Sequence, residues 1–202
     1  MVYQKLCLQK FRDLDIEDPI FTSLRNESLD DGMSFEEWFY QKMKSPSKMI
    51  VRYTDDKIDT VMAIRAEAQK IYMQNGWLKY APRFKLELFK PSNISIASAL
   101  LVAFCTCTRS LQSEFKQSYI VIPPHDEKLM TVLSKHIGFD STGVFPDGKY
   151  LYLRNNAAEI PVLRANREIY ADEVFPVVRE AINDSLCNYY SAEKIKVRSY
   201  LI

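Results

Sequence analysis

The sequence predicts an α/β fold in which a mixed central sheet is flanked by helices. Three patterns carry this prediction, and all three lie in residues 83–154. Short β-type runs (RFKLELF, SYIVIPP, KYLYLR) alternate with helical runs (IASALLVAFCTCTRSL, HDEKLMTVLSKHIGF), and small or turn-forming residues separate them. A chain of 202 residues fits one domain with an appendage. We therefore expect a main domain over residues 1–154 and an extension of helices and a final strand over residues 155–202.

Composition excludes several classes of protein. Apolar residues make up 47% of the chain, which is too high for a disordered protein. The 27 basic and 26 acidic residues give a net charge of +1, so no global charge attracts nucleic acid or a membrane surface. The net charge does not exclude a local basic patch. No apolar run approaches the roughly 20 residues of a membrane span, and no clear signal-peptide pattern opens the chain. We expect a cytoplasmic protein.

The front of the chain predicts two helices followed by strands. Residues 15–28 place a proline after an acidic residue, ahead of apolar residues at helical spacing. Residues 34–44 begin with Ser34 and carry Glu37 three positions later, the pattern of a capping box. Residues 48–53 and 57–67 are predicted strands around the turn TDDK, although the second stretch also has helical periodicity.

The middle of the chain is predicted as a loop over residues 72–82 and a strand from residue 83. Strand alternation places Leu86 and Leu88 on one face and Glu87 on the other. Residues 96–111 are predicted to form a helix that is apolar nearly all round, which indicates a helix packed on a sheet. A second helix ends at Gly138, and the Asp147-Gly148 dipeptide predicts a hairpin.

The last part of the chain is predicted as a linker over residues 155–166, one or two helices, and a closing strand over residues 194–202. Its aromatic residues could form an interface between copies of the chain or pack on the main domain; they are Tyr170, Phe175, Tyr189, Tyr190 and Tyr200.

Cysteine spacing argues against a disulfide or a metal site. Cys105 and Cys107 stand two residues apart on a predicted helix and therefore point away from each other. We expect them to be small buried residues and expect no bound metal.

The junction of the strand at 83–89 with the following helix predicts an anion site. Small residues lead into the helix N-terminus, where free backbone N–H groups and the positive end of the helix dipole converge. A phosphate-bearing ligand suits such a site. The competing interpretation is an ordinary helix cap made by Ser92, Asn93 or Ser95.

The order of these elements resembles the GNAT superfamily of acyl-CoA N-acyltransferases over about residues 11–154. FRDLDIEDPIFTSLR, FEEWFYQKM and KIDTVMAIRAE are similar to the front of one bacterial branch. The resemblance implies acetyl-CoA as co-substrate and an amine as acceptor, with a splayed pair of strands that receives the CoA arm. It assigns CoA contacts to the following residues: Leu88, Phe89, Lys90, Ser92, Asn93, Ile94, Ser95, Ile96 and Ala97.

This carried-over loop departs from the superfamily pattern. Ser95 and Ala97 stand where the superfamily has glycines, and the basic residue that opens the pattern is missing, with Lys90 two positions earlier. The resemblance implies Glu87 as general base, and we take Glu67 as a second candidate base. His125 lies where the CoA arm and the acceptor are expected to meet. The tyrosine that serves as acid in the superfamily is replaced here by Ser134.

Three interpretations of function therefore remain at the level of the sequence. The first is an acetyl-CoA-dependent N-acetyltransferase that acts on a primary amine by direct transfer. The second is a GNAT-like domain without catalysis that serves in binding, regulation or oligomerisation. The third is an interaction module unrelated to CoA. In the first two, Trp77 and Tyr80 are expected to border the acceptor pocket.

Overall fold

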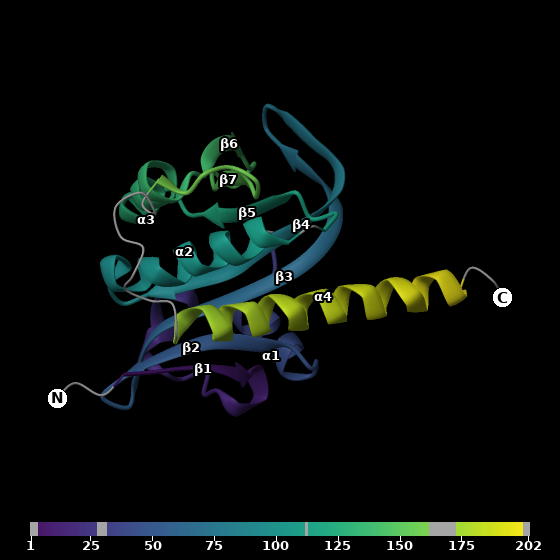
Figure 1. The fold of residues 1–202 in the computed structure, drawn as a ribbon. Coiled ribbons are helices and arrows are strands. Elements are labelled where there is room, and N and C mark those ends of the chain that lie inside the picture. The colour runs from purple at the N-terminus through teal and green to yellow at the C-terminus, as the bar shows by residue number, and fades with distance from the viewer. Residues whose placement is uncertain (1–3, 28–31, 112, 162–172, 200–202) are drawn as a thin grey trace.

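A computed structural model describes residues 4–27, 32–111, 113–161 and 173–199 of the chain (Figure 1). Strands and helices alternate as a mixed α/β fold requires. The strands are β1 Gln4–Lys10, β2 Lys48–Thr54, β3 Lys57–Met73, β4 Gly76–Pro91, β5 Gln117–Ile122, β6 Asp140–Val144 and β7 Tyr150–Asn155. The α-helices are α1 Phe35–Met43, α2 Ile94–Ser110, α3 Glu127–Val132 and α4 Val174–Ser199. Short 3₁₀ turns, η1 Phe11–Asp13 and η2 Pro19–Leu24, and a π-helical turn, η3 Leu133–Ile137, complete the elements.

The strands form one seven-stranded sheet in the order β1-β2-β3-β4-β5-β7-β6. Neighbouring strands are antiparallel except for β4 and β5, which are parallel. Helix α2 makes the crossover that a parallel pair needs. The predicted fold class, a mixed sheet flanked by helices, is confirmed.

Each face of the sheet is covered by different helices (Figure 1). On one face, α2 and α4 pack against Met62, Phe84 and Leu86. On the other, α1 and the 3₁₀ turns pack around Val61, Ala63 and Leu88. Because Val61, Met62 and Ala63 alternate between the two clusters, both faces of β3 are buried at this point.

A β-bulge in β4 corrects the predicted alternation of its side chains. Ala63 pairs with Leu88 and its neighbour Ile64 pairs with Leu86, so the register skips Glu87. Leu86 therefore faces α2 and Leu88 faces α1, on opposite sides of the sheet. The prediction that Leu86 and Leu88 share a face is wrong, because an extra residue in one strand shifts every side chain beyond it.

Residues 72–82 form a hairpin, not the predicted loop. Tyr72 pairs with Trp77, and Met73 pairs with Gly76 across the turn, where Gly76 has φ +145°. That backbone conformation is open to glycine and rarely to other residues. The hairpin extends β3 and β4 beyond the rest of the sheet (Figure 1).

Of the two helices predicted at the front of the chain, the second forms as predicted and the first is a short 3₁₀ turn. Ser34 and Glu37 make the predicted capping box at the start of α1. The helix predicted over residues 15–28 is a single 3₁₀ segment, Pro19–Leu24, capped by Asp18; Ser28 lies outside the described residues. β3 confirms the strand interpretation of residues 57–67. β1 carries no strong alternation of its own and was not predicted.

The later elements bring one confirmation and one correction. Gly138 ends η3 in a left-handed conformation with φ +83°, as its predicted role requires. The closing strand predicted from residue 194 is wrong up to Ser199, because α4 continues to that residue. Residues 162–172 and 200–202 lie outside the described part, together with Tyr170 and Tyr200. No helix in the described ranges is long and apolar enough to cross a membrane.

Candidate active site

The first cavity lies where the parallel strands part. β4 and β5 pair only from Arg83 to Leu86, although β4 continues to Pro91 and β5 to Ile122. The opened end of the pair leads to a cleft of about 510 Å³. The splay that the sequence resemblance implied is therefore present, and the cleft lies at the N-terminus of α2.

Most of the residues assigned from the sequence to a CoA site line this cavity together. The assigned residues that line it are Leu88, Phe89, Lys90, Ser92, Asn93 and Ile94, from β4, the following turn and the start of α2, and the candidate base Glu87 lines it with them. Ile120, Val121, Ile122 and Pro123 form the opposite wall, and His125, Asp126, Lys128 and Leu129 close it from the start of α3. Ala97 is fully buried in the core and does not line the cavity. Ser95 and Ile96 belong to the first turn of α2.

The turn between β4 and α2 is hydrogen-bonded to the β2–β3 hairpin. The Ser92 N–H donates to the Asp59 carbonyl at 2.7 Å. The Asp59 carboxylate accepts from Arg52 Nε at 2.7 Å and from the Thr54 hydroxyl. Burial raises the pKa of Asp59, but these hydrogen bonds and one from Thr60 outweigh it, so the pKa lies below its ordinary value. A fixed turn keeps the backbone amides at the helix start in place.

The lining of the first cavity contains lysines as well as the carboxylates of Glu27, Glu87 and Asp126. Lys90, Lys128 and Lys149 line it, and Lys149 Nζ lies 2.8 Å from Asp147 Oδ2. The lining carboxylate of Asp126 accepts a hydrogen bond from the Leu129 N–H and so caps α3. His125 is exposed at the rim. Cations beside a helix N-terminus suit a phosphate group.

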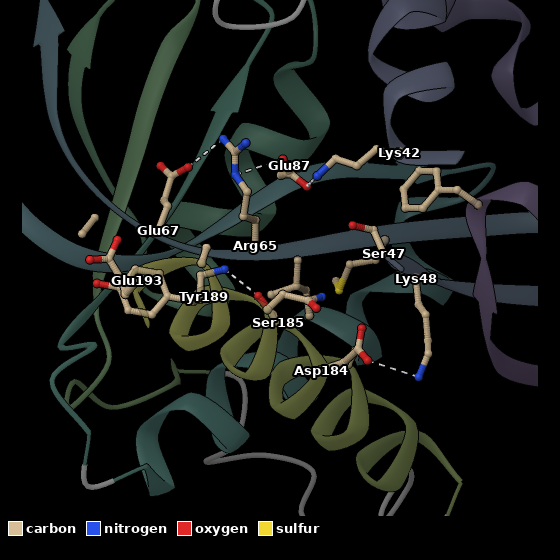
Figure 2. A pocket seen from close by; sticks show the side chains of 18 residues that line it. Lys42, Ser47, Lys48, Arg65, Glu67, Glu87, Asp184, Ser185, Tyr189 and Glu193 are labelled. Atoms are coloured by element: carbon tan, nitrogen blue, oxygen red, sulfur yellow. Dashed lines mark hydrogen bonds and ion pairs between the residues drawn. The ribbon is translucent and has the colours of Figure 1, made fainter. Parts of the chain in front are cut away.

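A second cavity, of about 310 Å³, lies beside β3 (Figure 2). β3 supplies Arg65 and Glu67, and α4 supplies Asp184, Ser185, Asn188, Tyr189 and Glu193. Lys42, from α1, and Lys48 complete the charged lining, and Lys48 Nζ lies 3.2 Å from Asp184 Oδ1. Glu87 lines both cavities and so belongs to the wall that they share.

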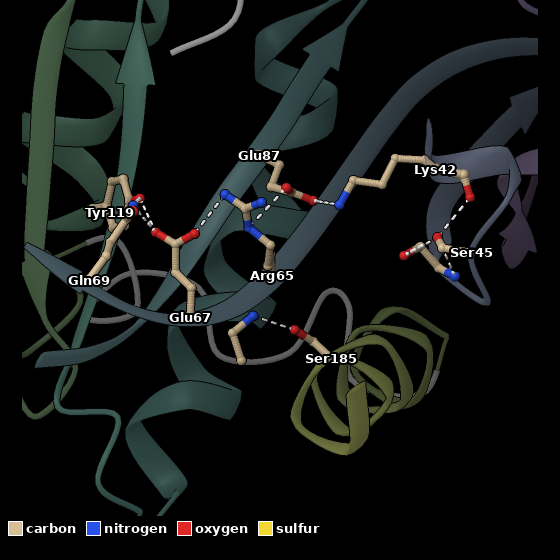
Figure 3. A network of polar contacts seen from close by, with 10 residues as sticks. Lys42, Ser45, Arg65, Glu67, Gln69, Glu87, Tyr119 and Ser185 are labelled. Carbon is tan, nitrogen blue, oxygen red and sulfur yellow. Dashed lines mark hydrogen bonds and ion pairs between the residues drawn. The ribbon is translucent and has the colours of Figure 1, made fainter. Parts of the chain in front are cut away.

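A chain of ion pairs holds that wall in place (Figure 3). Glu87 Oε2 accepts from Lys42 Nζ at 2.6 Å, and Glu87 Oε1 lies 3.0 Å from Arg65 Nε. The other end of the Arg65 guanidinium lies 2.6 Å from Glu67 Oε2. Glu67 Oε1 accepts from the Tyr119 hydroxyl and from the Gln69 amide. Both carboxylates are thus fixed by partners on two strands, β3 and β5, and on helix α1.

The structure brings Glu87 and Glu67 together through Arg65 and places His125 at the outer rim of the first cavity. Trp77 and Tyr80 line neither cavity and are 61% and 67% exposed on the β3–β4 hairpin. Ser134 is exposed on η3. Of the tail aromatics within the described part, Phe175 and Tyr189 pack partly against the core and Tyr190 is 43% exposed.

Sequence reasoning missed Lys42, Arg65, Tyr119, Lys128 and Lys149. One signal was available, because Arg65 and Glu67 stand two apart on a predicted strand and must share a face. The others come from separate elements, and only the folded sheet brings them together. The described residues contain no group of three or more side chains of the metal-binding types placed to hold an ion.

Comparison with known proteins finds similarity among solved structures. No protein-family model matches the sequence, and no curated protein matches it significantly. A crystal structure of a bacterial toxin aligns with a TM-score of 0.53 at 11% identity, covering 84% of this chain and 98% of that one. An N-acetyltransferase from Staphylococcus aureus Mu50 aligns at a TM-score of 0.41 and 12% identity, covering 78% and 99% of the two chains. A GNAT-family acetyltransferase from Streptococcus pneumoniae aligns at 0.39 and 10%, covering 75% and 99%. The likeness to the toxin is one of fold alone.

Proposed function

We propose that this chain is a CoA-dependent acyltransferase domain of the GNAT type, which moves an acetyl group from acetyl-CoA to a primary amine. The observation that carries the proposal is the first cavity. It opens where the β4 and β5 ladders separate and ends at the N-terminus of α2. A ligand that suits it has an extended, amide-bearing arm and a phosphate group at one end.

The unpaired part of β4 supports the binding of such an arm. Beyond Leu86, β4 has no partner in β5, so its backbone groups on that side resemble those of a sheet edge. The amides of an extended arm can pair with such an edge as an added strand would. Leu88, Ile122 and Leu129 offer apolar surface to the methylene groups of the arm.

The helix N-terminus supports the placement of the pyrophosphate. Backbone N–H groups of the first turn of α2 and the positive end of its dipole favour an anion there. Lys90 and Lys128 line the same cavity and add positive charge. Serine and alanine replace glycines at residues 95 and 97 of this chain; backbone donors do not depend on side-chain identity.

The shared wall supports transfer between the two cavities. The amine enters the second cavity, and its nitrogen attacks the thioester carbonyl carbon held in the first. The new N–C bond forms as the C–S bond breaks. Glu87 lies between the cavities and accepts the amine proton, while the CoA thiolate takes a proton from solvent. Each carboxylate oxygen has more than one acceptor site, so the contacts of Glu87 with Lys42 and Arg65 leave room for a proton.

Titration of the protein with acetyl-CoA, by calorimetry and by thermal unfolding, tests the donor site. Ligand at about one hundred times its dissociation constant adds about 2.7 kcal/mol of stability. Ser95→Asp should abolish the effect, because a carboxylate at the helix N-terminus is tolerated by the fold but repels phosphate. Lys128→Glu should weaken binding, whereas Lys79→Glu, at an exposed lysine on the hairpin, should not. A wild-type protein that ignores millimolar acetyl-CoA would overturn the proposal.

A second candidate is a domain that binds CoA without turnover. Lys42 and Arg65 already contact both oxygens of Glu87 and compete with a substrate amine for them. Ser134 also stands where the superfamily has the tyrosine that serves as general acid. Acetyl-CoA consumption measured against a panel of primary amines separates the two candidates. Binding with no amine-dependent consumption favours the second.

A further inference from the structure

The outer face of the β3–β4 hairpin carries an unusual group of exposed aromatic side chains. Tyr72, Trp77 and Tyr80 are 65%, 61% and 67% exposed. They account for three of the five large apolar side chains that are exposed in the described part of the chain. Aromatic rings cost free energy when left in water, so such a concentration on one short hairpin indicates a ligand that covers them.

A lysine lies among these rings. Tyr72 and Trp77 are directly opposite each other in the register of the hairpin. Lys70 Nζ lies 5.0 Å from the centroid of the Tyr72 ring and 4.9 Å from that of the Trp77 ring. Lys79 and Tyr80 fall opposite Lys70, where the register shifts between Gln69 and Ile71. The face therefore presents rings and ammonium groups side by side.

The inner face of the hairpin fixes this platform on the rest of the sheet. Ile71, with Met73 and Leu78 packed beside it, belongs to a cluster with Tyr119 and Leu151. At the tip, the Gln74 N–H donates to the Val144 carbonyl at 2.8 Å, and the Gln74 amide donates to the Phe145 carbonyl at 3.1 Å. The hairpin is thus anchored on the rest of the sheet through its inner face and its tip.

The charge of the hairpin is strongly one-sided. Residues 68–86 contain Lys70, Lys79, Arg83 and Lys85 and no aspartate or glutamate, although the whole chain has a net charge of only +1. Lys70 and Lys79 are exposed, whereas Arg83 and Lys85 are buried. A ligand that suits this face is therefore an anion with flat apolar groups.

We propose that the outer face of the β3–β4 hairpin binds single-stranded nucleic acid. Unpaired bases stack on Tyr72, Trp77 and Tyr80, and the phosphates lie near Lys70 and Lys79. Aromatic residues are enriched in protein–protein interfaces, but lysine is depleted there. Because this face combines its rings with lysines, a protein partner fits less well. A duplex fits less well, because its bases are stacked on each other and do not offer their faces.

Fluorescence anisotropy with labelled 12-nucleotide strands of RNA and of DNA tests the proposal, with the matching duplex as comparison. At 50 mM salt we expect micromolar binding of a single strand that weakens steeply as salt rises. Trp77 also reports directly, since Trp38, the only other tryptophan, is 8% exposed in the core. Stacking of a base should quench the Trp77 emission. The strand type that binds more tightly identifies the class of nucleic acid.

Variants connect binding to this face. Trp77→Ala and Tyr80→Ser should each weaken binding by about fivefold to a hundredfold, and Lys70→Gln should lower the salt slope by about one. Tyr40→Ala is the matched control, because Tyr40 is a 50% exposed aromatic on α1. All these positions are exposed, so the variants should fold, and circular dichroism checks that they do.

Three results would overturn the assignment. They are no strand binding by the wild-type chain at 50 mM salt, equal affinity of wild type and Trp77→Ala, and duplex binding as tight as single-strand binding. Sedimentation that shows self-association lost in Trp77→Ala would identify a protein contact in place of a nucleic acid. Stacking at this face requires no acyl transfer, so acetyl-CoA binding stands or falls separately.

Discussion

Arg65 Nε lies 3.0 Å from Glu87 Oε1, next to the β-bulge at which the pairing of β3 with β4 shifts register between Ala63 and Ile64. The bulge removes Glu87 from the regular alternation of β4, and Arg65 fixes the direction that its carboxylate then takes. Bulges are frequent beside active sites because they redirect a side chain without ending the strand. Here the redirected residue, Glu87, lines both cavities.

Glu87→Gln should separate catalysis from donor binding. The amide keeps the shape of the side chain but cannot take up the amine proton, so we expect kcat to fall by about 10²-fold or more. Acetyl-CoA affinity should stay within about twofold, because the proposed donor contacts come from the backbone and from lysines. Steady-state kinetics and calorimetry check the two quantities. Unchanged kcat would remove Glu87 from the reaction, and Glu67→Gln would then be the next variant to measure.

Loss of the charge at Glu87 should also destabilise the fold. Its side chain is 5% exposed and balances Lys42 and Arg65. Charged hydrogen bonds of this kind contribute about 1.5–3 kcal/mol. Urea unfolding of Glu87→Gln should show a loss of that order. Glu36→Gln, at an exposed position on α1, is the control and should change stability little.

The fold could be predicted from the sequence wherever one pattern decided an element. The apolar helix α2, the capping box at Ser34 and the Gly138 helix end each depend on a few neighbouring residues, and each is confirmed. The bulge at Glu87 depends on how β3 pairs with β4, so alternation within β4 alone gave the wrong faces for Leu86 and Leu88.

The hairpin at residues 72–82 was missed although its signal was present. Asn75-Gly76 is a strong turn dipeptide. The exposed positions beside it carry the aromatic residues Tyr72 and Trp77, so the sequence lacks the apolar–polar alternation that would have indicated strands. Similarly, the first cavity was predictable because one continuous segment, residues 87–94, supplies a wall of it. The second cavity was not, because residues of α1, β3 and α4 meet there only in the folded chain.

Ser185→Ala tests the docking of α4 on the sheet. The Ala66 N–H donates to Ser185 Oγ at 2.5 Å, and Ser185 is 6% exposed. Removal of the hydroxyl leaves a buried N–H without its acceptor, which costs about 1–3 kcal/mol. Urea unfolding should show this loss, whereas Glu180→Ala, an exposed change on the same helix, should fall within about 0.5 kcal/mol of wild type. Equal stability of Ser185→Ala and wild type would show that this contact does not hold α4.

Thiol labelling should follow burial. Burial raises the pKa of Cys105 to about 12 and raises that of Cys107 and Cys7 as well, while Cys187 is exposed. At pH 8 a pKa of about 12 leaves roughly one thiolate in ten thousand. Iodoacetamide followed by mass spectrometry should therefore modify Cys187 first and Cys105 only after unfolding. Early modification of Cys105 in the folded protein would contradict its position in the core.

Stability should fall in acid partly through Asp59. Its pKa is lowered in the folded state, because hydrogen bonds from Arg52, Thr54 and Thr60 outweigh the effect of burial. A lowered folded pKa stabilises the protein above the unfolded value of about 3.9, and this stabilisation is lost as pH falls through the folded pKa. Asp59→Asn should therefore cost about 1–3 kcal/mol at pH 7 and progressively less below pH 4. Urea unfolding of both proteins between pH 2.5 and pH 7 measures the difference. A difference that stays constant with pH would show that the Asp59 charge does not act in this way.

Because the Asp59 carbonyl accepts the Ser92 N–H, the same variant should also weaken acetyl-CoA binding at pH 7 if the carboxylate anchors the turn.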